Sequence, residues 1–220
     1  MSPRLRSRVE SLVRRLWYAH DPGLPLRALR TCLAPLSLVT AWAARRSRLR
    51  LRTHAAPRPP LLVVGNLVAG GAGKTPLVAA IASALAARGL HPGIVASGYG
   101  ATRSDARLVH PGDDPASAGD EPLLLAQATG LPVAAGRDRR AAVARLLAAH
   151  PQLDLVISDD GLQHAALARS VELAVFDDRG AGNGRLLPAG PLRAPLAQAA
   201  TMDALALNGD APAPIGLGGG

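Results

Sequence analysis

From residue 59 onward, short apolar runs alternate with longer segments in which apolar positions recur at helical spacing. The apolar runs predict buried strands, and they cover residues 61–65, 93–96, 131–135, 153–157 and 171–176. The segments between them, rich in Ala and Leu, predict helices at 76–88, 121–129 and 139–149. Strands that alternate with helices predict an α/β fold, with a parallel sheet covered by helices on both faces.

The first 58 residues have a different pattern. Residues 4–19 predict a short amphipathic helix rich in arginine, and Asp21-Pro22-Gly23 predicts a turn. A second helical segment begins near Leu26, and Pro35 is expected to kink it. Its uncharged stretch, Thr31–Ala44, is shorter than the ~20 residues that a membrane-spanning helix needs.

Charge separates the same two regions. The chain carries a net charge of +9, yet residues 1–58 alone hold 13 Arg against Glu10 and Asp21. A basic segment of this kind attracts nucleic acid or an anionic membrane surface. Two structures fit it: a helix that lies in a membrane interface, or an amphipathic helix packed on the next domain. Because the chain has one cysteine, an internal disulfide or a cysteine-ligated metal cluster is excluded.

Composition predicts three segments. The Pro-rich residues 55–60 indicate a boundary between a helical segment, 1–58, and an α/β domain, 59–208. The remaining residues, 209–220, are rich in Pro and Gly and are expected to be disordered.

A glycine-rich segment follows the first strand of the α/β domain and opens the next helix. Glycines in this position let backbone N–H groups and the helix N-terminus converge on phosphate oxygens. Lys74 is the only lysine among 25 basic residues, and we expect it to bridge the β- and γ-phosphates of ATP while the Thr75 hydroxyl binds Mg²⁺. Val68 stands where the strict P-loop pattern has glycine. The predicted nucleotide-binding residues are Val68, Ala69, Gly70, Gly71, Ala72, Gly73, Lys74 and Thr75.

Carboxylates follow two of the predicted strands. Asp159 and Asp160 follow the predicted strand 153–157 after Ser158, in the position where P-loop enzymes hold Mg²⁺. Lys74, Asp159 and Asp177 all follow strand ends and are expected on one edge of the sheet. Asp120 opens a predicted helix, and its spacing alone favours a helix N-cap.

Several motifs together resemble the tetraacyldisaccharide 4′-kinase family of lipid A biosynthesis. The resemblance extends over residues 15–208 in order and spacing. It rests on Val64-Gly65-Asn66-Leu67 with the glycine-rich segment, Gly98-Tyr99-Gly100, Gly119-Asp120-Glu121-Pro122, Asp159-Asp160-Gly161-Leu162-Gln163-His164 and Asn183 through Arg193.

The resemblance implies a P-loop NTPase-like fold and a reaction. An enzyme of this family transfers the γ-phosphate of ATP to the 4′-hydroxyl of a lipid A disaccharide precursor, a tetraacyldisaccharide 1-phosphate, and so forms lipid IVA. Asp120 and Lys74 would serve in catalysis, and Asp159 and Asp160 in metal and phosphate handling. The resemblance also implies a peripheral or monotopic protein on the cytoplasmic face of the bacterial inner membrane. Its N-terminal helix would contact the membrane surface, and it would bind no nucleic acid.

Three departures from the family pattern qualify this expectation. Ser97 directly precedes Gly98 where the family usually has an intervening Arg, and Ala194 replaces a family Glu. A C-terminal Phe-Pro-Asp-His-His-like motif, one His of which supports the catalytic Asp in the family, does not occur in these 220 residues. We therefore expect the C-terminal part of the family to be absent, and we expect the chain to bind MgATP but to phosphorylate the lipid poorly. The alternatives are a partitioning-type membrane-bound P-loop ATPase and a nucleotide-binding remnant without turnover.

Overall fold

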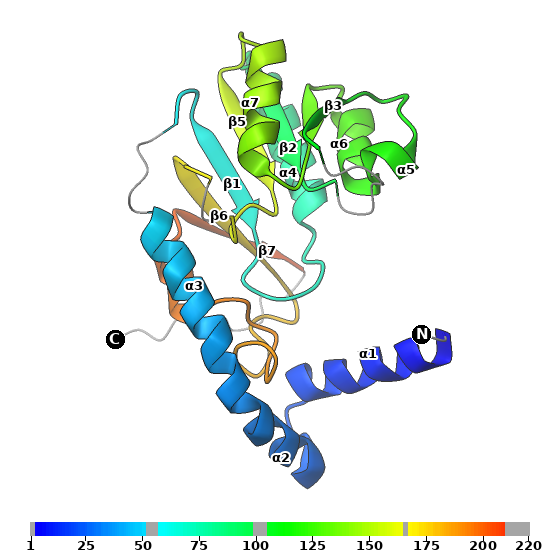
Figure 1. The fold of residues 1–220 in the computed structure, drawn as a ribbon, viewed down its shortest axis with the longest axis vertical. Helices are drawn as coiled ribbons and strands as arrows, with labels where there is room; N and C mark the ends of the chain where they lie inside the picture. The colour runs from blue at the N-terminus through cyan, green and yellow to red at the C-terminus, as the bar shows by residue number, and fades with distance from the viewer. Residues whose placement is uncertain (1–2, 52–56, 99–104, 165–166, 210–220) are drawn as a thin grey trace.

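The centre of the protein is a seven-stranded sheet, with the strands in the order β3-β4-β2-β5-β1-β6-β7 (Figure 1). A computed structural model describes residues 3–51, 57–98, 105–164 and 167–209. All neighbouring strands are parallel except β3, which runs antiparallel to β4. The strands are β1 (Leu61–Gly65), β2 (Pro92–Ala96), β3 (Arg107–Val109), β4 (Val133–Ala135), β5 (Leu155–Asp159), β6 (Val171–Asp177) and β7 (Ala204–Asn208).

The α/β fold is confirmed, but the prediction of an entirely parallel sheet is wrong at one edge. No helix separates β2 from β3 in the described residues, and a strand that returns without a crossover helix runs antiparallel. The two outermost strands, β3 and β7, were not expected from the sequence. The Tyr99-Gly100 part of one motif and the predicted tail from residue 210 onward lie outside the described residues.

Helices cover both faces of the sheet, as predicted. Alternate strand residues point to opposite faces. Val63 and Val95 belong to one core together with Leu146 of α7, whereas Val64 and Ile94 belong to a second core, which also includes residues of α4 and α6. The α-helices of the α/β region are α4 (Lys74–Ala86), α5 (Pro115–Ala118), α6 (Asp120–Thr129) and α7 (Arg139–Ala149), with a 3-10 helix η2 (Leu196–Thr201).

The N-terminal region forms three helices that extend away from the sheet (Figure 1). They are α1 (Pro3–Tyr18), α2 (Gly23–Leu33) and α3 (Ser37–Leu51), and the 3-10 turn η1 (Ala34–Leu36) joins the last two. The predicted interruption at Pro35 is therefore confirmed. Arg30 donates hydrogen bonds to the carbonyls of Leu16 (2.7 Å) and Ala19 (3.2 Å), so α2 caps the C-terminal end of α1.

Residues 183–193 connect these helices to the glycine-rich segment. On one side of this connecting loop, Trp17 Nε1 donates to the Pro188 carbonyl (3.1 Å) and Thr40 Oγ1 to the Leu187 carbonyl (2.8 Å). On the other side, the Ala69 amide donates to the Pro191 carbonyl (2.7 Å), at the entry to the glycine-rich segment. The motif from Asn183 to Arg193 therefore holds the N-terminal helices against the sheet.

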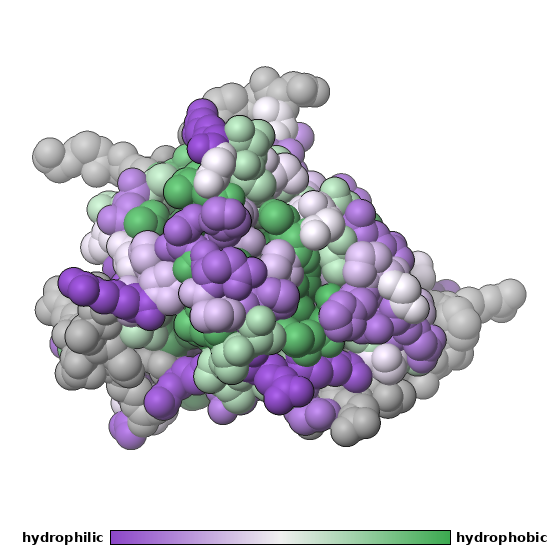
Figure 2. Space-filling model, turned by 90° about the horizontal axis from the view of Figure 1, so that it is seen from above, coloured by the Kyte–Doolittle hydropathy of each residue, from purple (hydrophilic) through white to green (hydrophobic). Residues whose placement is uncertain are grey.

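The surface carries apolar residues at both ends of the molecule. Figure 2 views the end at which β1 begins, where polar residues surround smaller apolar areas. The N-terminal helices expose a larger apolar set, with side chains exposed by 44% to 81%: Leu5, Val9, Leu12, Leu24, Leu36, Leu38, Val39, Trp42 and Leu49. No helix in the described part of the chain is both long and apolar enough to cross a bilayer.

Candidate phosphate-binding site

The glycine-rich segment runs from the end of β1 into the first turn of α4. Gly70 (φ 110°) and Gly73 (φ 77°) adopt backbone conformations that favour glycine, and Gly73 is the residue before α4. A Cβ on Gly73 would also meet the side-chain amide of Asn208, which would have to move. The strand, loop and helix therefore form the predicted cradle, with α4 beginning at Lys74, two residues earlier than expected.

Lys74 is held at the mouth of this cradle. Its Nζ donates to Asn66 Oδ1 (3.3 Å) and lies 3.7 Å from Asp160 Oδ1. Asn66 is buried, and its Nδ2 donates to the Gly70 carbonyl (2.9 Å). The side chain that orients the lysine thus also fixes the start of the glycine-rich segment.

Two of the three predicted metal ligands, Thr75 and Asp159, meet next to the lysine. The last residue of β5, Asp159, pairs in register with Val64 of β1, one residue before that strand ends. Thr75 Oγ1 donates to Asp159 Oδ2 (2.8 Å), and the carboxylate is buried. Burial raises the pKa of Asp159, and the negative charge of Glu121 raises it further, while the Thr75 hydrogen bond opposes these effects.

Asp160 has a less buried position and a strained backbone. Its φ of 51° lies in the left-handed region, which few non-glycine residues adopt. This turn directs the carboxylate toward two cations, since Oδ1 faces Lys74 and Oδ2 lies 3.5 Å from Arg193 Nη1. Strain at a polar cluster of this kind is typical of a functional site.

The carboxylates fit a hard cation. Asp159 Oδ1 is buried and accepts no hydrogen bond from any residue that the structure describes. An unpartnered carboxylate oxygen beside a threonine hydroxyl is the oxygen donor set that Mg²⁺ prefers, with phosphate and water completing the shell. Thr75, Asp159 and Asp160 are thus the residues suited to hold Mg²⁺.

Two arginines brace the site, and the sequence reasoning did not identify either. Arg139, only 2% exposed, donates to the carbonyls of Asp159 (3.1 Å) and Gly136 (2.7 Å), and burial lowers its pKa. Arg179 donates to the Gly71 carbonyl (2.7 Å) and pairs with Asp177 (2.9 Å from Nε to Oδ2). Arg139 could have been identified from the sequence, because it is the first residue of a helix that follows a strand of a parallel sheet, and such positions lie at the ligand-binding edge. Only the three-dimensional fold brings Arg179 to the loop.

Asp177 lies at the same edge of the sheet as Lys74 and Asp159, as predicted. It does not contact the glycine-rich segment directly in the described residues; it holds Arg179, which donates to the Gly71 carbonyl. The guanidinium of Arg179 also lies over the ring of Tyr18, with its carbon 5.5 Å from the ring centroid. Because Tyr18 ends α1, this contact links the N-terminal helices to the glycine-rich segment.

Asp120 is the first residue of α6, and its side chain is exposed. Gly119 takes the N-cap position and no side chain caps this helix, so the N-cap interpretation of Asp120 is wrong. Among the described residues, no hydrogen bond or ion pair joins Asp120 to Lys74, Asp159 or Asp160. Its neighbour Glu121 lies near enough to the site for its negative charge to raise the pKa of Asp159.

Comparison with known proteins agrees with this geometry. The family model described as tetraacyldisaccharide-1-P 4′-kinase, LpxK, matches residues 29–216. The chain belongs to this family. The LpxK assignment favours the lipid kinases over the partitioning-type ATPases considered above.

Relatives of the LpxK family are similar over most of this chain. A tetraacyldisaccharide 4′-kinase of Bordetella petrii is 50% identical over 90% of the chain, and one of Chromobacterium violaceum is 47% identical over 94%. The chain covers 56% and 61% of these two proteins, so it spans little more than half of their length.

A solved structure supports the P-loop kinase fold. The crystal structure of "apo" form LpxK from Aquifex aeolicus in complex with ATP has a TM-score of 0.69 and 32% sequence identity. The match covers 82% of this chain and 59% of that protein.

Proposed function

We propose that the chain binds MgATP at residues 68–75. The observation that carries this proposal is the cluster at the start of α4, where the only lysine of the sequence lies 3.7 Å from Asp160 and the Thr75 hydroxyl bonds to Asp159. Lys74 would bind the β- and γ-phosphates, and the backbone N–H groups of the loop would bind phosphate oxygens. Mg²⁺, held by Thr75, Asp159 and Asp160, would supply neutralisation of the phosphate charge when bound.

The phosphoryl acceptor in this proposal is the 4′-hydroxyl of a tetraacyldisaccharide 1-phosphate, and the product is lipid IVA. Family membership supports this acceptor. Asp120 would orient the hydroxyl and accept its proton. The match of Gly119-Asp120-Glu121-Pro122 to the family motif supports that role.

The N-terminal helices would hold the protein on the cytoplasmic face of the inner membrane. Two features support this part of the proposal: the exposed apolar residues of α1 and α3, and the excess of arginines in residues 1–58. On α3, the Arg46 guanidinium lies over the ring of Trp42 (5.4 Å from its carbon to the centroid). An aromatic ring beside an arginine suits the level of anionic lipid headgroups.

Transfer of labelled phosphate tests the proposed reaction. Wild-type chain is incubated with [γ-³²P]ATP, Mg²⁺ and tetraacyldisaccharide 1-phosphate, and the lipid product is separated by chromatography. We expect label at the 4′ position with wild type, at a rate far below that of the longer relatives, and none with Lys74→Ala. Nucleotide binding without label in the lipid would contradict the transfer reaction and support the remnant without turnover.

A further inference from the structure

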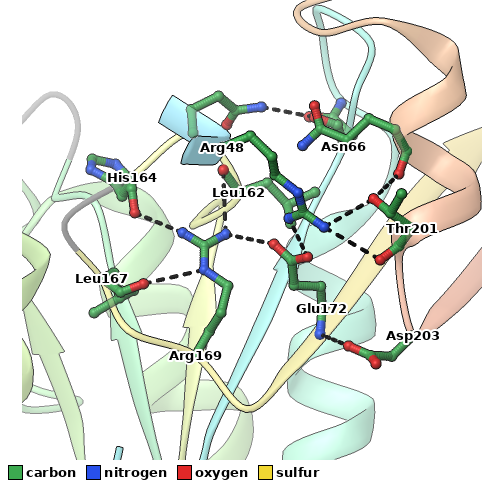
Figure 3. A network of polar contacts seen from close by, with 11 residues as sticks. Arg48, Asn66, Leu162, His164, Leu167, Arg169, Glu172, Thr201 and Asp203 are labelled. Atoms are coloured by element: carbon green, nitrogen blue, oxygen red, sulfur yellow. Dashed lines mark hydrogen bonds and ion pairs between the residues drawn. The ribbon is translucent and has the colours of Figure 1, made fainter. Parts of the chain in front are cut away.

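The N-terminal helices are joined to the body of the protein at several separate places. At the end of α3, Arg48 forms an ion pair with Glu172 and donates to Thr201 Oγ1 (2.9 Å). Figure 3 shows this network, in which Arg169 holds Glu172 from the other side (3.0 Å). No bond that Arg48 makes in the described residues reaches the glycine-rich segment. The end of α1, by contrast, contacts Arg179 of the phosphate-binding site.

The segment that follows β6 packs closely around the last turn of α1. The Asn183 amide donates to the Trp17 carbonyl (2.8 Å), and Asn183 Nδ2 donates to the Leu16 carbonyl (3.2 Å). Gly182 approaches so closely that an added Cβ would lie 2.9 Å from the Trp17 carbonyl oxygen and 3.1 Å from Cδ1 of Tyr18. These contacts fix the end of α1 against the segment that follows β6.

Tyr18 presents its ring to the guanidinium of Arg179. The guanidinium carbon lies 5.5 Å from the ring centroid, within the range of a cation–π contact. The hydroxyl oxygen of Tyr18 is buried and has no hydrogen-bond partner in the described residues, so the ring alone makes this contact. The Arg179 side chain is 38% exposed, and an exposed arginine samples many rotamers unless its neighbours restrict it.

Arg179 is held from three directions. Asp177 binds one edge of the guanidinium, with Nε 2.9 Å from Oδ2 and 3.1 Å from Oδ1. On the opposite side, Nη2 donates to the Gly71 carbonyl (2.7 Å). The ion pair alone would let the planar guanidinium tilt about the carboxylate, whereas the ring of Tyr18 covers one face and sets the plane of the group. Tyr18 therefore helps to direct Nη2 toward Gly71.

The bond to Gly71 orients one peptide group of the glycine-rich segment. A trans peptide group points its carbonyl oxygen and its N–H in opposite directions, so this bond turns the Ala72 N–H away from Arg179. The carbonyls on either side are held in the same way, by Asn66 Nδ2 (2.9 Å) and by Asn208 Nδ2 (3.2 Å). Three side chains from outside the loop thus fix three successive peptide groups. The direction of such N–H groups decides how well a loop binds phosphate.

We propose that Tyr18 is a positioning residue for the phosphate-binding loop and acts through Arg179. The docked end of α1 keeps the Gly71–Ala72 peptide group in the orientation that binds phosphate, so MgATP binds more tightly while α1 is in place. This inference rests on the proposed function, since it names a residue outside the loop on which nucleotide affinity depends. Coupling between two sites is reciprocal, so bound MgATP also holds the end of α1 more firmly against the body.

Calorimetric titration of MgATP into the full chain tests the role of the ring. Tyr18→Leu keeps an apolar side chain but removes the ring, and it should raise Kd roughly fivefold, as expected for the loss of a partly exposed cation–π contact. Tyr18→Phe keeps the ring and loses only a hydroxyl that has no partner in the described residues, so it should bind within roughly twofold of wild type.

Arg48→Met is the matched control, because it loosens the attachment of α3 without touching the glycine-rich segment. It should lower Tm, since it breaks a partly buried ion pair, and leave MgATP affinity within roughly twofold of wild type. Tm is also measured for Tyr18→Leu. A purely structural role for Tyr18 would lower Tm in the same way without changing Kd.

A double-mutant cycle tests whether Tyr18 acts through Arg179. In an Arg179→Met background, Tyr18→Leu should cause no further loss of MgATP affinity. Hydrogen exchange measures the reciprocal effect: saturating MgATP should slow exchange of the amides in the last turn of α1 in wild type but not in Arg179→Met.

Three results would overturn the proposal: unchanged Kd in Tyr18→Leu, an equal loss of affinity in Tyr18→Leu and Arg48→Met, or the same effect of Tyr18→Leu with and without Arg179. Titration of the wild-type chain separates these failures from a failure of the proposed function. If wild type bound no MgATP, the proposed function would be wrong and this inference would fall with it.

Discussion

The Thr75 hydroxyl donates a 2.8 Å hydrogen bond to the buried carboxylate of Asp159. This bond joins the first turn of α4 to the end of β5, and so it brings the two segments expected to hold Mg²⁺ into contact. The bond uses one carboxylate oxygen, while Oδ1 is buried and without a hydrogen-bond partner in the described residues. A buried carboxylate oxygen without a partner can bind a cation, but it lowers the stability of the folded protein while no cation is bound.

Asp159→Asn should stabilise the protein in the absence of nucleotide and metal. The raised pKa of Asp159 means that the folded state prefers the neutral acid. The raised pKa of Asp159 therefore stabilises the folded protein at low pH. This stabilisation is fully present below the pKa of Asp in the unfolded chain, about 3.9, and it is lost as pH rises through the pKa of Asp159 in the folded protein. At neutral pH we expect a gain of about 1 kcal/mol, or roughly 2–4 °C in Tm, by thermal unfolding.

Asp154→Asn is the control for that experiment. The backbone amide and ring of His91 lower the pKa of the exposed Asp154. The ionised form of Asp154 therefore stabilises the folded state, whereas ionisation of Asp159 destabilises it. The stabilisation by Asp154 is present above the unfolded pKa and is lost as pH falls through the folded pKa. Asp154→Asn should not stabilise the protein at neutral pH. If both variants raised Tm equally, burial of Asp159 would not be the cause.

Arg179→Ala should weaken ATP binding by roughly tenfold. The change removes the bond to the Gly71 carbonyl and frees the loop, and a hydrogen bond from a charged group contributes about 1.5–3 kcal/mol. Isothermal titration calorimetry measures the effect. The control is Arg145→Ala on the exposed side of α7. Equal affinity in both variants would show that Arg179 does not brace the loop.

Gly73→Ala should abolish nucleotide binding and lower stability by roughly 1–3 kcal/mol. The residue has a φ of 77°, and its Cβ would meet Asn208. Gly89 has a similar φ of 86°, and an added Cβ there would meet nothing within 4 Å. Gly89→Ala is therefore the control: it carries the same backbone strain as Gly73→Ala but lies away from the site. Denaturant unfolding should show a loss in both variants, while calorimetry should show lost ATP binding only for Gly73→Ala. Normal ATP affinity in Gly73→Ala would contradict the role of the loop.

Trp42→Glu should weaken attachment to vesicles that contain phosphatidylglycerol by roughly tenfold. It replaces a 62% exposed apolar ring on α3 with a charge that anionic lipids repel. Leu90→Glu, at the opposite end of the molecule, is the control and should leave sedimentation with the vesicles unchanged. A similar loss in both variants would mean that α3 does not face the membrane.

Much of the fold could be predicted because its central strands are buried on both faces. The runs Leu61–Gly65 and Leu155–Ile157 are apolar without a break, and the sheet then brings Lys74 and Asp159 to one edge. The outermost strands could not be predicted in this way. Ala204–Asn208 is largely exposed and β3 has three residues, so neither has a distinctive pattern.

The site shows a similar division. Lys74, Thr75 and Asp159 could be singled out from short-range motifs, and the fold brings them together at one edge of the sheet. Arg179 lies 108 positions from Gly71 in the chain, and no local pattern predicts a bond over that separation. Apolar spacing predicted the helical segment that begins near Leu26, but how this segment attaches to the body depends on residues 183–193, which no local pattern indicates.

Calorimetric titration of MgATP into the wild-type chain and into Lys74→Ala tests the central claim most directly. Lys74 supplies a charge-assisted bond to phosphate in a partly buried cradle, and its loss should cost roughly 3 kcal/mol, or at least a hundredfold in Kd. Circular dichroism should show that the variant remains folded. The account predicts saturable binding to wild type and none measurable to Lys74→Ala. Equal affinity of the two folded proteins would contradict it.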